Sequence, residues 1–149
     1  MKEKGVAVMI VHFSETSEEL TSFFNQIFEE QYVQYFQEAK PKNQKKQVQF
    51  VVKDDAARIL AAASCQQLYQ TLKIENLAVD SVFQKQKFGS QLLDYIKDYA
   101  RAHNILTLTL STRSYQAKDF YLKQGFHIYG QLADVPFEGV TTYYFVYKL

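Results

Sequence analysis

Apolar and polar residues follow two periods along this chain, and together they predict an alternation of strands and helices. Period-two alternation and short apolar runs predict strands at residues 6–13, 48–53, 58–69, 72–80, 105–111, 126–132 and 141–149. The first of these runs is almost continuously apolar, so we expect a strand buried on both faces. Apolar residues at helical spacing predict helices over residues 18–28, 31–38, 88–104 and 115–124.

This order of elements predicts an α/β fold, which some schemes class as α+β. Residues 54–56 read as a hairpin turn between two strands, so the early strands should pair antiparallel. Later, helical segments separate consecutive strands, which is typical of parallel pairing. The sequence therefore predicts a central mixed sheet with helices packed on it.

Size and charge narrow the class of protein. The chain has 149 residues, so we expect a single domain over residues 1–149. Its net charge of +1 gives no electrostatic footprint for nucleic acid or an anionic membrane, and we expect neither as a partner. Cys65 is the single cysteine, no cluster has zinc-binding spacing, and we expect no metal. The sequence start lacks a signal-peptide pattern, so we expect a cytoplasmic protein.

Residues 74–93 carry the first candidate site. They begin as a strand, continue as a polar segment over residues 84–87, and end as a helix. Gly89 allows close approach to the backbone just where the helix begins. A loop that leads into a helix directs several N–H groups and the positive end of the helix dipole to one place. This is a physical site for an anion such as phosphate, although most such turns are plain connectors.

The same stretch resembles the acyl-CoA-binding motif of the GNAT acetyltransferases. In that family a strand ending Leu-x-Val is followed by Arg/Gln-x-x-Gly-x-Gly/Ala and a helix. Leu77 and Val79 match the strand, Gln84 matches the first loop position, and Gly89 matches the last. Lys87 stands where the family usually has its first Gly, and its ammonium group is able to contact a pyrophosphate.

A second motif supports this resemblance. GNAT enzymes carry Asn-x-x-Ala-x-x-Phe-Tyr-x-x-x-Gly-Phe, which is similar to residues 114–126 here, with Ser114 in place of the Asn. The matching residues are Ala117, Phe120, Tyr121, Gly125 and Phe126. The resemblance covers roughly residues 48–149 and implies a GNAT fold, with a mostly antiparallel sheet flanked by helices on both faces.

The resemblance also implies a reaction, the transfer of an acetyl group from acetyl-CoA to an amine. Tyr121 occupies the family's position for the group that hydrogen-bonds the departing sulfur, and Glu75 is the candidate general base. Acetyl-CoA, as co-substrate, is expected to contact a set of residues from both motifs: Leu77, Ala78, Val79, Gln84, Lys85, Gln86, Lys87, Phe88, Gly89, Ser90, Ser114, Ala117 and Phe120.

Several readings of the acceptor stay open at this point. We expect a small-molecule amine; the alternatives are a protein N-terminus or lysine, or a non-catalytic acyl-CoA-binding sensor. Glu75 is equally well read as an exposed strand carboxylate, which leaves a water chain or another residue as the base. A homodimer through the last strands is also an expectation, because a terminal strand presents an edge and Tyr143, Tyr144 and Phe145 lie there.

Overall fold

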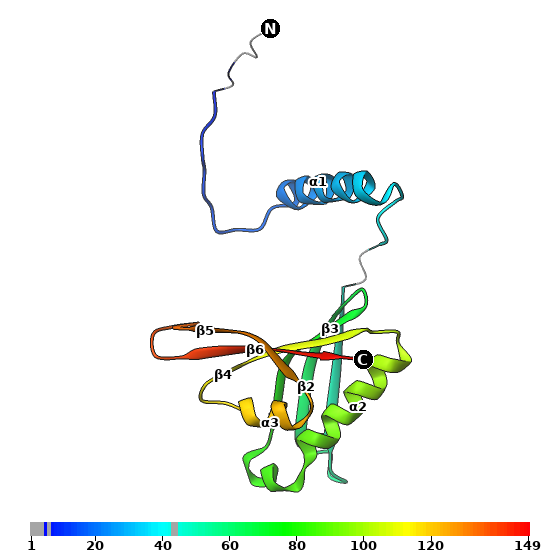
Figure 1. Cartoon of the computed structure of the whole chain (residues 1–149), viewed down its shortest axis with the longest axis vertical. Coiled ribbons are helices and arrows are strands. Elements are labelled where there is room, and N and C mark those ends of the chain that lie inside the picture. Colours follow the sequence, from blue (N-terminus) through cyan, green and yellow to red (C-terminus); the bar gives the residue numbers. More distant parts are fainter. Residues whose placement is uncertain (1–4, 6, 43–44) are drawn as a thin grey trace. The chain divides into compact units, whose positions relative to one another are not determined.

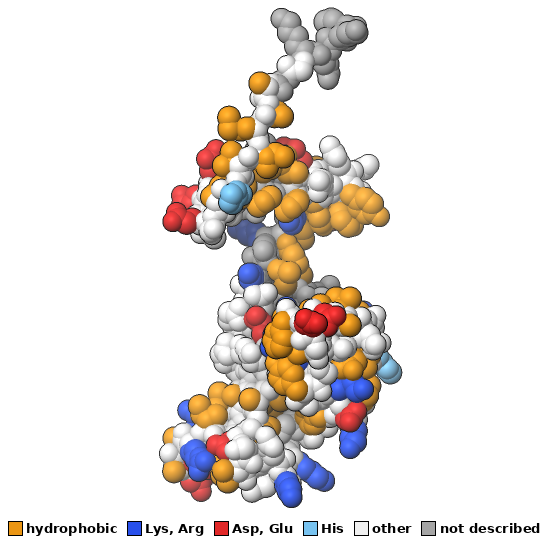
Figure 2. Space-filling model, turned by 90° about the vertical axis from the view of Figure 1, so that its left-hand side faces the viewer, with side chains coloured by type: hydrophobic (Ala, Val, Ile, Leu, Met, Phe, Trp, Pro, Cys, Tyr) orange, Lys and Arg blue, Asp and Glu red, His pale blue; other side chains and the backbone are white. Residues whose placement is uncertain are grey.

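A computed structural model describes residues 5, 7–42 and 45–149, and the chain forms two compact units, residues 1–42 and 43–149 (Figure 1). The first unit contains the helix α1 (Glu18–Phe36). The side-chain oxygen of Ser17 caps it by accepting a hydrogen bond of 3.2 Å from the Leu20 amide. The two helical segments predicted here are therefore one continuous helix. Its unit exposes hydrophobic side chains, Phe23 and Phe28 among them (Figure 2).

The strand predicted at residues 6–13 is not formed. Val6 lies outside the described residues, and residues 7–13 have no regular secondary structure. Val8, Met9 and Ile10 are exposed rather than buried. An apolar run becomes a strand only when a neighbouring strand pairs with its backbone, and the length of the run says nothing of that partner.

The second unit is built on a six-stranded sheet with the order β1-β2-β3-β4-β6-β5 (Figure 1). The strands are β1 (Lys46–Lys53), β2 (Ile59–Leu68), β3 (Thr71–Val79), β4 (Thr107–Arg113), β5 (His127–Ala133) and β6 (Thr141–Lys148). Neighbouring strands pair antiparallel except β3 and β4, which are parallel. The predicted mixed, mostly antiparallel sheet with packed helices is confirmed.

Two helices cover one face of this sheet. The helix α2 (Phe88–Ala102) buries an apolar stripe that includes Leu93, Ile96 and Ala100 against β1, β2 and β3. The shorter α3 (Lys118–Lys123) adds Tyr121 to the same core, beside Phe145 of β6. Both helices therefore pack on the same face of the sheet and share one hydrophobic core with it.

The parallel pair β3 and β4 separates part-way along its length. Register pairing joins Thr71–Ile74 to Thr107–Leu110 and then ends. Beyond that point β3 pairs only with β2, and β4 only with β6. A β-bulge lies where the two strands part, since Cys65 pairs with Ile74 but Ser64 pairs with Asn76, leaving Glu75 as the extra residue. The sheet therefore opens between its two central strands.

Candidate active site

A cleft of about 920 Å³ occupies the opening between β3 and β4. This volume is at the upper end of the roughly 300–1,000 Å³ typical of small-molecule sites. The C-terminal halves of both strands line it, together with the start of α2 and the region from residue 115 to α3. It lies wholly within the second unit. Ligands of α/β sheets commonly bind at the carboxyl ends of parallel strands, where neighbouring connections diverge.

The separation of the strands leaves one edge of β3 without a strand partner. The Asp80 amide donates to the Leu60 carbonyl of β2 at 2.8 Å. Since N–H groups alternate in direction along a strand, those of Leu77 and Val79 face away from β2 and toward the cleft. Backbone donors and acceptors are therefore available there to an extended polar ligand.

A short 3₁₀ helix, η1 (Ser81–Gln86), forms the loop that leads from β3 to α2, where the sequence predicted an irregular polar segment. Asp80 caps it by accepting from the Val82 amide at 3.0 Å, and pairs with Arg58 at 3.1 Å. The Arg58 guanidinium also lies over the Phe83 ring, 5.0 Å from its centroid. The Val82 hydrogen bond, followed by the Arg58 guanidinium, lowers the pKa of the Asp80 carboxyl below its usual range. The loop is thus held by a small polar cluster at its start.

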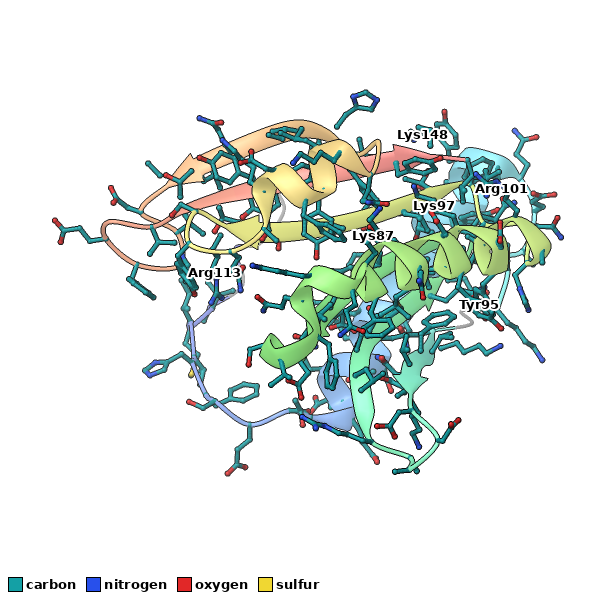
Figure 3. All side chains as sticks on the ribbon, turned by 90° about the horizontal axis from the view of Figure 1, so that it is seen from below. Lys87, Tyr95, Lys97, Arg101, Arg113 and Lys148 are labelled. Atoms are coloured by element: carbon teal, nitrogen blue, oxygen red, sulfur yellow. The ribbon has the colours of Figure 1, made fainter. Side chains whose placement is uncertain are left out.

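Lys87 and Gly89 join this loop to α2. Lys87 has a φ of 62° and a ψ of 22°, the left-handed conformation that glycine adopts most readily. Lys87 lines the cleft at the start of α2 (Figure 3). A Cβ on Gly89 would lie 3.1 Å from Cζ of Phe120 and 3.4 Å from Cγ2 of Val79. Gly89 therefore permits close contact between the start of α2, β3 and α3.

Tyr121 places a phenol in the wall of the cleft. Its ring is packed among Phe120, Phe126 and Phe145, and the residue is 7% exposed. Burial raises the pKa of the Tyr121 hydroxyl, so the group stays protonated well above neutral pH. None of the other described residues forms a hydrogen bond with this hydroxyl. The phenol is therefore a neutral donor in the cleft, still free to bind a ligand atom.

Glu75 is the carboxylate of the cleft. It is the extra residue of the β3 bulge, and its side chain is exposed at the point where the sheet opens. Cys65, on the neighbouring strand, is fully buried, and burial with the nearby Glu75 charge raises the pKa of its thiol to about 12. Cys65 is thus an inert core thiol.

Most of the predicted site residues come together in this cleft. It contains both candidate catalytic residues and nine of the predicted cofactor-binding residues: Glu75 and Tyr121, with Leu77, Ala78, Val79, Gln84, Lys87, Gly89, Ser90, Ala117 and Phe120. Ser90 also accepts a hydrogen bond of 2.9 Å from Gln124.

Four of the predicted cofactor-binding residues are not part of the cleft wall: Lys85, Gln86, Phe88 and Ser114. Ser114 does not cap the helix that follows it, although serine is a favourable residue at the start of a helix. Its hydroxyl accepts from the Thr141 amide at 3.2 Å, which ties β4 to β6. The helix starts later because Gln116 accepts from the Arg113 amide at 2.9 Å and holds residues 113–116 as a turn.

The sequence interpretation missed the part of the wall that β4 and the turn after it provide. These residues are Leu110, Ser111, Thr112, Arg113, Tyr115 and Gln116, together with Ile74 and Asn76 of β3. Strand β4 itself was predicted. The sequence does not indicate where β4 separates from β3, because the alternation of apolar and polar residues is the same whether or not a strand has a partner.

A family model described as Acetyltransferase (GNAT) family matches residues 13–126. The chain belongs to the GNAT acetyltransferase family. No match was found among curated proteins.

Solved structures of GNAT acetyltransferases have the same fold. An acetyltransferase from Bacillus cereus ATCC 14579 is 25% identical, with a TM-score of 0.73, over 93% of this chain and 98% of that chain. The ribosomal-protein-S18-alanine N-acetyltransferase from Escherichia coli is 19% identical, with a TM-score of 0.62, over 77% and 75%. A protein from Bacillus anthracis str. Ames, solved in complex with acetyl coenzyme A, is 20% identical, with a TM-score of 0.62, over 77% and 68%.

As a member of this family, the protein uses acetyl-CoA as co-substrate. The cleft fits such a ligand in its chemistry, because the unpaired edge of β3 suits an amide-containing arm and Lys87 lies at a helix start, where anions are favoured. Within the described part of the chain, no group of three or more His, Cys, Asp or Glu residues is placed to hold a metal ion. No helix among the described residues is long and apolar enough to span a membrane.

Proposed function

We propose that this GNAT acetyltransferase transfers the acetyl group of acetyl-CoA to the primary amine of a small molecule, by direct attack in a ternary complex. The observation that carries this proposal is the cleft itself. It combines an unpaired strand edge, a helix start with a lysine, a buried neutral phenol and a carboxylate, all within one opening of the sheet. Its volume suits a cofactor arm and a small acceptor rather than a folded partner.

Acetyl-CoA would be held by the two motifs. The backbone of Leu77, Ala78 and Val79 would bind the pantetheine arm and the thioester carbonyl, since the N–H groups of Leu77 and Val79 face the cleft. The segment 84–90 would bind the pyrophosphate through its N–H groups, the helix dipole and the Lys87 ammonium. The neighbouring wall of Ala117 and Phe120 would pack against the arm.

Tyr121 would assist departure of the sulfur. When the amine attacks, a C–N bond forms, the C–S bond breaks, and negative charge develops on the sulfur. A phenol, with an ordinary pKa of about 10, is a suitable hydrogen-bond donor to a thiolate. Burial raises the pKa of Tyr121 further, which keeps its proton in place through neutral pH. The absence of a hydrogen-bond partner among the other described residues leaves this donor available.

Glu75 would accept the proton that the amine loses, directly or through water. Its bulge position puts a carboxylate at the mouth of the opening between β3 and β4. We expect Glu75→Gln to lower turnover selectively at lower pH, where a larger share of the amine is protonated and needs a base. The measurement is kcat against pH at saturating substrates. A pH profile identical to that of the parent would remove Glu75 from the mechanism.

We further propose that residues 1–149 act as one acetyltransferase domain, supported by a family match that extends across the boundary between the two compact units. Cytoplasmic location and a homodimer through the last strands stay predictions. Sedimentation of the full chain at several concentrations would test the dimer, and a monomer throughout would contradict it.

The test of function is acetylation of a broad panel of small primary amines by the full chain. CoA thiol release gives the rate, and mass spectrometry identifies the acetylated product. Acetylation of a small amine, with no product on peptide N-termini or lysines at equal concentration, would support the proposal. Product on peptides alone would favour a protein acetyltransferase. Binding of acetyl-CoA without turnover of any amine would favour a sensor.

A further inference from the structure

The charged residues of the cleft carry information about the acceptor. Among the described residues that line it, three are charged: Glu75, Lys87 and Arg113. Neither of the two ion pairs formed by described residues involves any of them. Each charge is therefore open to a ligand. Lys87 is accounted for by the phosphate loop and Glu75 by proton transfer, but Arg113 has no role in the reaction as proposed above.

Arg113 lies on the opposite face of the sheet from α2 and α3. Along β4, Leu108, Leu110 and Thr112 are buried, while Ser111 and Arg113 are exposed. Because side chains alternate along a strand, Arg113 faces away from the side where Leu108 and Leu110 join the core under α2. In Figure 3 it also lies far from the cations Arg101 and Lys148.

Glu75 is on that same far face. Ala63 and Cys65 of β2 are buried in the core on the side of α2, so Ser64 between them faces away. Within the bulge, Glu75 and Asn76 together oppose Ser64. The cleft thus passes through the opened sheet, with Glu75 and Arg113 on one face and Gly89, Phe120 and Tyr121 on the other.

The guanidinium of Arg113 is held but not neutralised. Its Nη1 donates to the Tyr115 hydroxyl at 3.1 Å, and Tyr115 also lines the cleft. This bond leaves other N–H donors of the planar group unused, in the fork geometry that matches a carboxylate. A cation fixed by a neutral partner, on the face that carries the candidate base, is suited to an anionic group of the acceptor.

We propose that the acceptor is a small amine that also carries a carboxylate, with its amine at Glu75 and its carboxylate on Arg113. This inference rests on the proposed function and names the substrate class of the same site. In the reaction, the amine nitrogen forms the new C–N bond and gives a proton to Glu75. The C–S bond breaks, and the sulfur leaves with a hydrogen bond from Tyr121. The carboxylate keeps its charge throughout and acts only in binding.

The other source of an anion for Arg113 is a phosphate of the coenzyme itself. Lys87, the unpaired start of α2 and η1 lie on the side of the cleft that continues to Gly89 and Phe120. Arg113 faces away from that side, which favours the acceptor over the coenzyme. The two sources predict different kinetics, because a phosphate contact would change the KM for acetyl-CoA with every acceptor.

The experiment compares two matched series with the full chain. One series is glycine, β-alanine, 4-aminobutyrate, 5-aminopentanoate and 6-aminohexanoate; the other is the n-alkylamines with the same number of methylene groups. We expect kcat/KM for at least one carboxylated acceptor to exceed that of its matched alkylamine by roughly 10- to 100-fold, the size of a charge-assisted hydrogen bond. The chain length that is preferred would report the spacing between amine and carboxylate.

Variants then assign the preference to Arg113. Arg113→Met should bring kcat/KM for the preferred acceptor down to the level of its alkylamine, and Arg113→Lys should retain part of the preference. Arg101→Met, which removes an exposed cation outside the cleft, should keep it in full. A thermal melt of each variant checks that it is folded. The comparison of the two acceptor series with the parent chain does not depend on the variants.

Two outcomes would show that the acceptor carboxylate is not bound by Arg113: the parent acetylates the alkylamines equally well or better, or its preference for the carboxylated acceptor survives in Arg113→Met. A third would assign Arg113 to a phosphate of the coenzyme: Arg113→Met raises the KM for acetyl-CoA with every acceptor. If neither series is acetylated while other small amines are, this inference fails and the proposed function holds. If no amine of any kind is acetylated, the proposed function fails with it.

Discussion

At the scale of single residues, the cleft uses side chains that are also part of the core. Tyr121 packs its ring against Phe126 and Phe145 while its hydroxyl reaches the cleft. The ring contributes to packing and the hydroxyl to chemistry, so the two roles can be separated by removing a single oxygen atom.

Tyr121→Phe should lower kcat by about 10²-fold, the usual contribution of a general acid, and leave the dissociation constant of acetyl-CoA within about twofold. The hydroxyl has no hydrogen-bond partner among the other described residues, so the melting temperature should change little. Kinetics at saturating substrates, with isothermal titration of acetyl-CoA, measure both. Tyr95→Phe is the matched control, since Tyr95 lies on α2 outside this cleft. An unchanged kcat would exclude Tyr121 from the mechanism.

The resemblance to the two family motifs was sufficient to select Tyr121, Gly89 and Glu75, all three of which line the cleft, because each motif lies within one short stretch of the chain. Arg113 was not found in this way. Its position in the cleft depends on where β3 and β4 stop pairing, and that depends on contacts with β2 and β6 elsewhere in the sequence. Local patterns therefore predict the residues of a motif better than the wall that tertiary structure adds to it.

At the scale of elements, the connection from β3 to α2 carries backbone strain at Lys87. A non-glycine residue in the left-handed conformation costs about 1–2 kcal/mol, and the family pattern places glycine at this position. A lysine at this position adopts the left-handed conformation less favourably than glycine, but it places a positive charge at the start of α2.

Lys87→Gly and Lys87→Ala separate those two effects. Both remove the ammonium, but only glycine relieves the left-handed backbone, so Lys87→Gly should be more stable than Lys87→Ala by about 1 kcal/mol. If the charge binds the pyrophosphate, both variants should lose acetyl-CoA affinity to a similar extent, roughly tenfold, and more at low salt than at high salt. Urea unfolding and isothermal titration provide the measurements. Affinity retained in both would show that the ammonium does not contact the phosphates.

The polar cluster at the start of η1 predicts a pH dependence. The pKa of Asp80 is lowered, first by the Val82 amide and then by Arg58, so its carboxylate contributes stability above its ordinary pKa of about 3.9. That contribution is lost as the pH falls through the lower folded-state value. The difference in melting temperature between the parent and Asp80→Asn should therefore be present at neutral pH, begin to decline at about pH 4, and disappear only once the pH has fallen through the lower folded-state pKa.

Asp55→Asn, in the turn between β1 and β2, is the control for this series. The difference in melting temperature between Asp55→Asn and the parent should not show the loss at acid pH that is expected for Asp80→Asn. A difference at Asp80 that stays constant from neutral to acid pH would contradict a stabilising carboxylate at the start of η1.

Element types were predicted well where the pattern was local and poorly where it needed a distant partner. The hairpin of β1 and β2 formed as expected, helped by Asp54 accepting hydrogen bonds from the Ala56 and Arg58 amides. The apolar run at residues 6–13 did not form its predicted strand over the described residues 7–13. A turn residue acts on its own neighbours, whereas a strand requires hydrogen bonds from another segment, which the run itself does not specify.

At the scale of the whole molecule, the cleft is a product of the sheet's topology. One parallel pair is set between antiparallel pairs, and each of its strands follows its other neighbour once the shared register ends. The opening therefore needs no disruption of the core, which remains continuous beneath α2 and α3. A ligand that fills the opening would bridge β3, β4 and both helices, and so it should stabilise the folded unit as a whole.

Acetyl-CoA binding should accordingly raise the melting temperature of the full chain. A ligand at 100 times its dissociation constant stabilises the folded state by about 2.7 kcal/mol. At roughly 2–4 °C per kcal/mol for a protein of this size, the expected shift is about 5–10 °C. CoA should produce a similar shift and adenosine alone should not, because in the proposed binding mode the unpaired edge of β3 and the Lys87 region would contact the arm and the phosphates rather than the base. No shift at millimolar acetyl-CoA would mean that the lysine at the glycine position closes the phosphate site, leaving a GNAT fold without its co-substrate.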